Sequence, residues 1–336
     1  MNIKYPSRTD IVTAMSNPEV SFKSDDLIGG SIIKKGSRAV QYSGGYSTVF
    51  PFDTKNNEKI AVRLWIADIG DAKRRSSEIS NYLEKLNNDY FAKFRYVDSA
   101  ILINGIIYPV VIMDWISGET LKDYIQENIH NSGRIINLAT KFKTMVEYFH
   151  KENIAHGDLQ HGNILVKENG EIVVIDYDSM FIEPLGGMPD IIKGLVGYQH
   201  PKRRSNQHLN NKLDYFSELV IYLSLLVYAN TPSLWDKYYG TEDLLFSKED
   251  LDDPNSSELI AKLILSDDAT ISLLAGKLKE ELNKNDILEL CPLEELLINK
   301  LEEAKDNIFD KWNKQPNPPT KGKPTFPDKK SITDKF

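Results

Sequence analysis

The chain has 336 residues, a net charge of −8, a hydrophobic fraction of 41% and an aromatic fraction of 10%. This composition is ordinary for a globular protein that can hold two lobes, and the negative charge argues against a nucleic-acid partner bound through phosphate contacts. The single cysteine, Cys291, excludes an intrachain disulfide and a cysteine-rich zinc site. The N-terminus shows no secretory signal pattern, and the most apolar run, residues 219–229, is shorter than the ~20 residues that span a bilayer. We therefore expect a cytoplasmic protein with no membrane segment.

The first third of the chain predicts a small sheet that carries one helix. Residues 1–37 are expected to be a lead-in with one short helix near residues 8–15, and residues 38–113 to be mostly strands. Four strand-like runs occur in this second segment, at 39–42, 48–52, 59–65 and 106–113. Residues 71–86 interrupt them with apolar side chains at helical spacing.

From residue 114 onward the pattern becomes mostly helical. Four short elements precede Asp214: helices at 120–125 and 137–150, and strands at 163–166 and 172–175. Helical spacing then continues to about Trp312, and residues 313–336, which are rich in Pro, Lys and Gly, are expected to be a disordered tail. The sequence therefore predicts an α+β fold with two lobes: a small antiparallel sheet with one main helix, then a mostly α-helical lobe over residues 114–312.

Two segments carry the candidate chemistry, HGDLQHGN at residues 156–163 and DYD at residues 176–178. Asp158 and Asn163 lie five residues apart in a loop that follows a helix, and Asp176 follows a short hairpin. Phosphoryl transfer needs a carboxylate near the attacking hydroxyl, ligands for magnesium and positive charge against the phosphates. Hard oxygen ligands of this kind suit Mg²⁺.

These segments resemble the eukaryotic-like protein kinase family. Asp158 matches the catalytic Asp of its H-R-D-L-x-x-x-N loop, Asn163 its metal-binding Asn, and Asp176 the Asp of its D-F-G motif. Three further segments match in family order: a hinge at 113–116, a G-T-x-x-Y-x-x-P segment at 194–201, and the start of a large central helix at 214–217. The likeness covers roughly residues 38–230, and the spellings HGDLQHGN, DYD and YQHP resemble a bacterial subgroup of kinase-like proteins.

The resemblance implies a bilobal protein-kinase-like fold with Mg·ATP between the lobes. Adenine is expected to bond the backbone around Asp114 and Ile116, beside a gatekeeper residue, Met113. The apolar side chains expected above and below the base are Val49, Ala61 and Leu165. Asn163 and Asp176 are expected to hold Mg²⁺, while Asp158 accepts or orients the acceptor hydroxyl.

The phosphate-binding residues depart from the family pattern. Arg63 stands where the family carries the Lys of V-A-I-K, and an arginine fork is not equivalent to an ammonium. Arg63 either holds the α- and β-phosphates by bidentate contacts, or its presence abolishes catalysis and leaves nucleotide binding alone. We expect Glu78, on the predicted helix, to pair with Arg63, with Glu84 as its competitor.

The glycine-rich loop departs from the pattern as well. Gly44 and Gly45 are retained, and their lack of a side chain lets backbone amides approach phosphate. Tyr42 and Ser47 replace the outer glycines of G-x-G-x-x-G, so we expect the loop to hold nucleotide less closely.

Four more departures concern regulation and the acceptor. Gly157 replaces the Arg of H-R-D, which removes the usual partner of an activation-loop phosphate. Gln160 replaces a Lys of Ser/Thr kinases, Asp178 replaces the Gly of D-F-G, and Lys202 replaces the Glu of A-P-E. The basic run 202–204 either binds an acidic acceptor or is a solvated surface.

The sequence thus predicts an ATP-dependent protein kinase that phosphorylates a protein hydroxyl, and the resemblance implies the Ser/Thr type. One alternative is a pseudokinase that acts as a nucleotide-binding or scaffold module, and a second is a small-molecule kinase. The retained Asp158, Asn163 and Asp176 favour an active enzyme, and the segment at 194–201 favours a protein acceptor. The expected partner is a protein substrate or regulatory protein.

Overall fold

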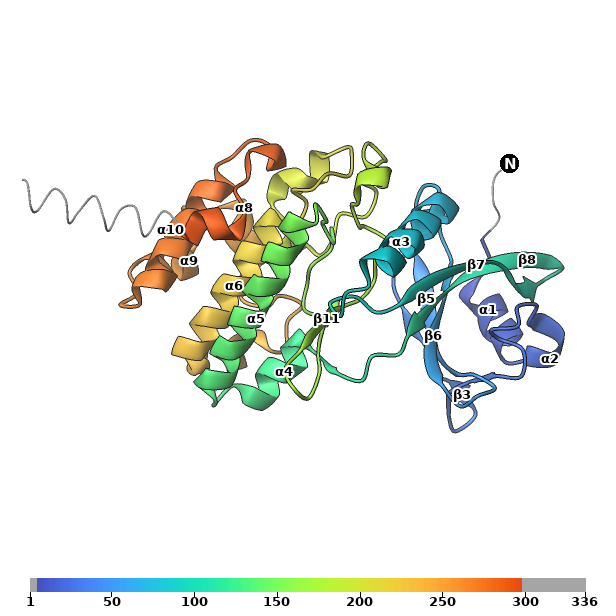
Figure 1. The fold of residues 1–336 in the computed structure, drawn as a ribbon. Coiled ribbons are helices and arrows are strands. Elements are labelled where there is room, and N and C mark those ends of the chain that lie inside the picture. The colour runs from blue at the N-terminus through green and yellow to red at the C-terminus, as the bar shows by residue number, and fades with distance from the viewer. Residues whose placement is uncertain (1–4, 298–336) are drawn as a thin grey trace, which may run out of the picture. The chain divides into compact units, whose positions relative to one another are not determined.

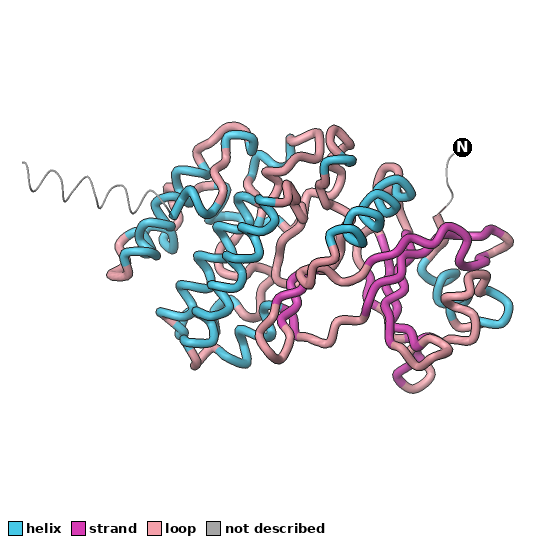
Figure 2. The backbone as a smooth tube through the Cα atoms, viewed as in Figure 1, coloured by secondary structure: helices cyan, strands magenta, loops and turns pink. Residues whose placement is uncertain are grey.

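The computed structural model describes residues 5–297, which form two lobes joined near residue 115 (Figures 1 and 2). The first lobe is a sheet flanked by helices, and the second is mainly helical. The predicted bilobal α+β fold is therefore confirmed. The predicted tail, residues 313–336, and the predicted end of the second lobe at residue 312 lie outside the described residues.

The first lobe is built on an antiparallel sheet in the order β1-β5-β6-β8-β7, with β4 paired to β5. The strands of this lobe, with the separate β2–β3 hairpin, are β1 (Ser31–Ile32), β2 (Lys34–Lys35), β3 (Arg38–Ala39), β4 (Tyr42–Ser43), β5 (Ser47–Asp53), β6 (Lys59–Trp65), β7 (Phe94–Ile103) and β8 (Ile106–Asp114). The register places Arg63 of β6 between Val49 of β5 and Val111 of β8. Because side chains alternate along a strand, Ala61, Arg63 and Trp65 share one face.

Helix α3 (Ala72–Leu86) covers that face of the sheet. Its apolar side chains follow helical spacing, so Ile79 and Leu83 are buried while polar residues face solvent. Asp71 caps the N-terminus of the helix through its carboxylate.

Helices α1 (Arg8–Met15) and α2 (Pro18–Ser21) cover the opposite face (Figure 1). They form a second core with the sheet, which includes Ile11, Met15, Phe22, Phe50, Phe52 and Val62. The helix over residues 8–15 is as predicted, and the described part of the predicted lead-in, residues 5–37, also contributes a strand to the sheet. Strand β1 pairs with β5, and a short helix such as α1 is stable only when its apolar side packs on another element.

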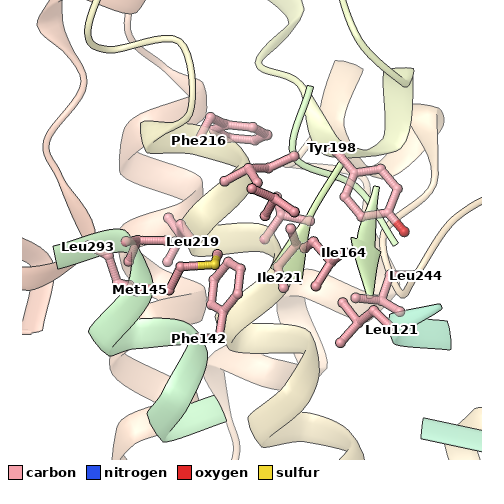
Figure 3. Packing of buried hydrophobic residues seen from close by; sticks show 14 of the residues in the cluster. Leu121, Phe142, Met145, Ile164, Tyr198, Phe216, Leu219, Ile221, Leu244 and Leu293 are labelled. Atoms are coloured by element: carbon pink, nitrogen blue, oxygen red, sulfur yellow. The ribbon is translucent and has the colours of Figure 1, made fainter. Parts of the chain in front are cut away.

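The second lobe is a group of helices around α6. Its helices are α4 (Leu121–Asn128), α5 (Ser132–Lys151), α6 (Tyr215–Asn230), α7 (Trp235–Tyr238), α8 (Lys248–Asp252), α9 (Glu258–Ile264) and α10 (Ala269–Leu282). Helix α6 is apolar on all sides and almost wholly buried, which fits a central helix. Phe142 and Met145 of α5 pack near Leu219 and Ile221 of α6 (Figure 3). None of the helices within residues 5–297 is both long and apolar enough to cross a membrane.

A small antiparallel sheet brings the two motif segments together. Its strands, in the order β11-β10-β9, are β9 (Glu119–Thr120), β10 (Ile164–Val166) and β11 (Ile172–Val174). Ile164 at the start of β10 pairs with Val174 at the end of β11, so the residues just outside this hairpin are neighbours. The amide of Ile175 donates to the carbonyl of Asn163 at 3.0 Å. Short 3₁₀ turns occur at Glu183–Leu185, Val196–Tyr198, Pro201–Ser205, Pro232–Leu234 and Ile287–Glu289.

His150 ties the end of α5 to the C-terminal part of the described chain. Its Nε2 lies 2.8 Å from Glu218 of α6, and its Nδ1 lies 2.8 Å from Glu294. Burial alone would lower the pKa of His150, but the two carboxylates outweigh burial and raise this pKa to about 9. The imidazolium therefore persists at neutral pH.

We predict that Ile11→Ala lowers the free energy of unfolding by about 2–5 kcal/mol, because Ile11 is fully buried between α1 and the sheet. Chemical denaturation measures this loss. Val20→Ala serves as the control, since Val20 is 67% exposed and its truncation should change stability by less than about 0.5 kcal/mol. Equal stability of Ile11→Ala and wild type would show that α1 is not part of the folded lobe.

A second prediction concerns the pH dependence of stability. The unfolded pKa of a histidine is about 6.5, so the stabilisation from His150 is complete below that pH and is lost as the pH rises through about 9. Denaturation of wild type at pH 6.5 and at pH 9.5 should show this loss, and His150→Gln should show a flatter profile. The assignment fails if both proteins have the same pH dependence.

Candidate active site

A cavity of about 420 Å³ lies between the lobes and collects most of the predicted nucleotide-binding residues. The predicted residues that line it are Gly44, Val49, Ala61, Arg63, Met113, Asp114, Ile116, Asn163, Leu165 and Asp176. Gly45, Asp158 and Glu78 were also predicted but do not line it. A larger hollow of about 650 Å³ also contacts Met113 but contains neither Arg63 nor Asp176, so the smaller cavity is the candidate site.

The lining of the cavity also includes Tyr42 and Trp115, whose side chains the sequence did not single out for binding. Tyr42 of β4 and Trp115 of the connection face each other with ring centroids 6.1 Å apart. Arg8 of α1 donates to the carbonyl of Gly44 at 2.7 Å, which holds the glycine-rich loop from outside. A side chain at Gly44 or Gly45 would meet no atom within 4 Å, so both positions are open.

The loop over residues 156–163 is hydrogen-bonded to Asp214, at the N-terminus of α6. The carboxylate of Asp214 accepts hydrogen bonds from the amides of His156 and Gly157, the latter at 2.8 Å. The fully buried His156 bonds the carbonyl of Ile175 at 2.9 Å, so it packs and orients the loop. Gly157 has a φ of 79°, and a Cβ there would lie 2.2 Å from the carbonyl oxygen of Ser179. Only glycine fits, which explains the missing arginine of H-R-D.

Asp158 is oriented by two donors from different segments. Its Oδ1 accepts the amide of Leu195 at 3.2 Å, and its Oδ2 accepts Nδ2 of Asn163 at 3.1 Å. Burial, and next the nearby carboxylate of Asp176, raise the pKa of Asp158 to about 7. Such a carboxylate is a better proton acceptor at neutral pH than an exposed one.

Asn163 and Asp176 present oxygen atoms suited to a hard cation. Since Nδ2 of Asn163 donates to Asp158, its carbonyl oxygen is the atom left for a metal. Asp176 has a φ of 70°, an uncommon conformation for a non-glycine residue, and its side chain is 46% exposed. No group of three or more His, Cys, Asp or Glu side chains within residues 5–297 is arranged to hold a metal. The pair fits a Mg²⁺ ion that takes its other ligands from phosphate and water.

Arg63 is buried, at 3% exposure, and each of its three donor groups has a partner. Its Nε donates to Oγ of Ser47 at 2.9 Å and its Nη1 to Oδ1 of Asp176 at 3.0 Å, while its Nη2 contacts Asp178. The predicted ion pair with Glu78 is therefore wrong, and Glu84 is not a partner either.

The reason for this correction is the rotation of α3. The buried residues of α3 are Arg75, Ser76, Ile79 and Leu83, so the helix directs a cation, not an acid, toward this region. Arg75 donates to the carbonyls of Gly70, at 2.7 Å, and Pro189. The acid comes instead from Asp178, which is 5% exposed. Burial raises the pKa of Asp178 above its usual range, and Arg63 opposes this shift.

The segment that follows Asp178 is anchored by a second buried arginine. Arg203 is 1% exposed and forms two bonds with Asp190, at 2.8 and 3.1 Å. It also donates to the carbonyl of Gly157 at 3.0 Å. Arg203 is therefore neither solvated nor free for an acidic acceptor. Lys202 and Arg204 beside it are exposed, and Arg204 pairs with Asp252 at 3.7 Å.

Two further polar contacts hold the segment from Gln160 to Gly162. His161 bonds the hydroxyl of Tyr198 at 2.6 Å, and burial lowers the pKa of His161 to about 4, so it is uncharged at pH 7. The side chain of Gln160 accepts the amide of Gly162 at 2.6 Å.

The fold and this arrangement of residues are those of a protein kinase. The sequence model described as "Protein kinase domain" matches residues 43–281, and the chain belongs to this family.

Several named kinases are similar to the chain. A probable serine/threonine-protein kinase of Dictyostelium discoideum is 29% identical over 170 residues, which cover 48% of this chain and 23% of the relative. One of Clostridium acetobutylicum is 28% identical over 144 residues, covering 40% and 20%. Wall-associated receptor kinase 5 of Arabidopsis thaliana is 23% identical over 260 residues, covering 73% and 32%. The chain thus spans a third or less of the length of these relatives.

We predict that Gly157→Ala destabilises the protein by more than Gly187→Ala, with both measured by chemical denaturation. The two glycines have nearly the same φ, 79° and 77°, so both substitutions incur a backbone strain of about 1–2 kcal/mol. Only at Gly157 does the added Cβ collide with a neighbour, whereas at Gly187 it meets no atom within 4 Å. Equal losses of stability would contradict the close approach of Gly157 and Ser179.

Proposed function

We propose that the chain is an active protein kinase that transfers the γ-phosphate of Mg·ATP to a hydroxyl group of a protein, of the Ser/Thr type. The observation that carries the proposal is that the oriented carboxylate of Asp158 contacts Asn163, while Asn163, Asp176 and Arg63 line one cavity. These are the proton acceptor, the metal ligands and the positive charge that phosphoryl transfer requires.

The nucleotide binds in the cavity between the lobes. The backbone of Asp114 and Ile116 bonds the adenine edge, and the side chains of Val49, Ala61 and Leu165 pack against its faces. The phosphates extend toward Arg63 and the open backbone of the glycine-rich loop, where positive charge and amide groups favour anions.

The chain's own groups then align the acceptor. A bound Mg²⁺ would neutralise charge on the phosphates, with Asn163 and Asp176 as its protein ligands. Asp158, fixed by the amide of Leu195 and by Asn163, orients the acceptor hydroxyl and accepts its proton. A base positioned in this way contributes about 10²–10⁴-fold to the rate.

Two observations keep other functions in view. The contact between Arg63 and Asp176 occupies a proposed metal ligand, which would suit a pseudokinase that binds nucleotide without turnover. Gln160, in place of the usual lysine, would suit a small-molecule acceptor.

Membership of a bacterial subgroup and a cytoplasmic location stay predictions from the sequence.

The test measures nucleotide binding and the transfer of label from γ-labelled ATP. The acceptors offered are generic proteins, the chain itself and, as representative small molecules, aminoglycosides. We expect wild type to label protein, Asp158→Ala to bind nucleotide within about threefold of wild type but to transfer about 10²–10⁴-fold more slowly, and Asp176→Ala to lose transfer. Equal transfer by Asp158→Ala would refute the role of that residue. Nucleotide binding without label on any acceptor would favour the pseudokinase, and label on aminoglycoside alone would favour the small-molecule kinase.

A further inference from the structure

Three departures from the kinase sequence pattern meet at one point in the structure. Arg63 replaces a lysine, Ser47 replaces an outer glycine of the glycine-rich loop, and Asp178 replaces the glycine of D-F-G. The side chains of Ser47 and Asp178 each bind a different nitrogen of the Arg63 guanidinium. The three substituted residues are therefore in direct contact, with Arg63 between Ser47 and Asp178.

The contacts of the Arg63 guanidinium differ in how deeply their partners are buried. Ser47, Arg63 and Asp178 are all buried, at 7%, 3% and 5% exposure. Asp176, the partner of Nη1, is 46% exposed. An arginine has five donors in a planar fork, so two buried partners fix the plane and leave one side for a further ligand. Nη1, which contacts Asp176, lies on the side of the cavity, because Arg63 and Asp176 both line it.

The charge of Arg63 also requires a carboxylate partner, because water does not reach this buried side chain. A buried cation without a counter-ion is strongly destabilising, and α3 supplies no acid at this place. Asp178 is the buried acid in contact with Arg63. Arg75 of α3 lies close enough to Asp178 to add a second positive charge beside this carboxylate.

The backbone on both sides of Asp178 is fixed. The hydroxyl of Tyr177 donates to the carbonyl of Val174 at 2.7 Å, and Phe181 exchanges two backbone bonds with Ala155, at 2.8 and 3.1 Å. Asp178 is thus a rigid support on the same segment as Asp176.

We propose that Asp178 is the positioning residue of the phosphate-binding Arg63, assisted by Ser47, and that it takes the place that the sequence pattern assigns to a glutamate of α3. The inference rests on the proposed binding of ATP in this cavity. Its consequence is that the alignment of Arg63 follows the segment from Asp176 to Asp190, and not the position of α3. Arginine, serine and aspartate at these three positions make one phosphate-binding unit.

The experiment compares the affinities of Asp178→Asn, Asp178→Glu, Ser47→Ala and Glu78→Gln for ATP, ADP and adenosine by calorimetric titration, with thermal unfolding of each variant. We expect Asp178→Asn to weaken ATP and ADP binding by about tenfold or more, because a charge-assisted contact that orients Arg63 is lost. Adenosine, which has no phosphate, should bind within about twofold of wild type. Asp178→Glu should recover part of the affinity, and Ser47→Ala should lose less than Asp178→Asn.

Glu78→Gln is the matched control, and its affinities for all three ligands should equal those of wild type. The inference is overturned if Glu78→Gln weakens ATP binding as much as Asp178→Asn, or if Asp178→Asn weakens ATP and adenosine equally, which is the result of a merely structural role. If Asp178→Asn does not fold, the test passes to Ser47→Ala, and unchanged ATP and ADP affinity in that variant overturns the inference. A wild type that binds ATP but transfers no phosphate would refute the proposed function alone, because the affinities still decide this inference.

Discussion

A buried guanidinium must have a negative partner, and this requirement at Arg63 organises the rest of the site. Water cannot stabilise the charge of a side chain that is only 3% exposed, so the fold must bring carboxylates to it. Asp176 and Asp178 are those carboxylates, and both come from the other lobe. The pair therefore joins the central strand β6 of the sheet to the segment that carries the proposed metal ligand.

The same physical solution occurs a second time in the segment after Asp178. Arg203 and Asp190 form a buried pair that also reaches the carbonyl of Gly157. The hydroxyl side chains between Asp176 and Pro201 are Tyr177, Ser179 and Tyr198, and all of them are buried. The ion pair between Arg203 and Asp190 therefore holds this segment in place through fixed side chains. In other proteins, a phosphate group paired with arginine can order a segment.

The N-terminal helices extend this organisation to the outer face of the sheet. Helix α1 lies outside the part of the chain that matches the kinase domain, residues 43–281, yet its side chains complete the second core. Arg8 at its start holds Gly44, so the helix is connected to the glycine-rich loop. The first lobe is therefore larger than the matched domain.

The sequence by itself determined the main helices, most of the longer strands and the local motif, but it did not predict strands β1 and β7 of the main sheet. Asp158 and Asn163 were predictable because they share one loop, and the hairpin of β10 and β11 brings Asp176 beside them. The tertiary structure decided the partner of Arg63, which lies 115 positions away, and the burial of Arg203. Spacing along a helix predicts which residues share a face, but the neighbouring elements decide which face turns inward. On α3 the apolar spacing of Ile79 and Leu83 sets this rotation, which buries Arg75 and leaves Glu78 half-buried, but the spacing does not tell which acid pairs with Arg63.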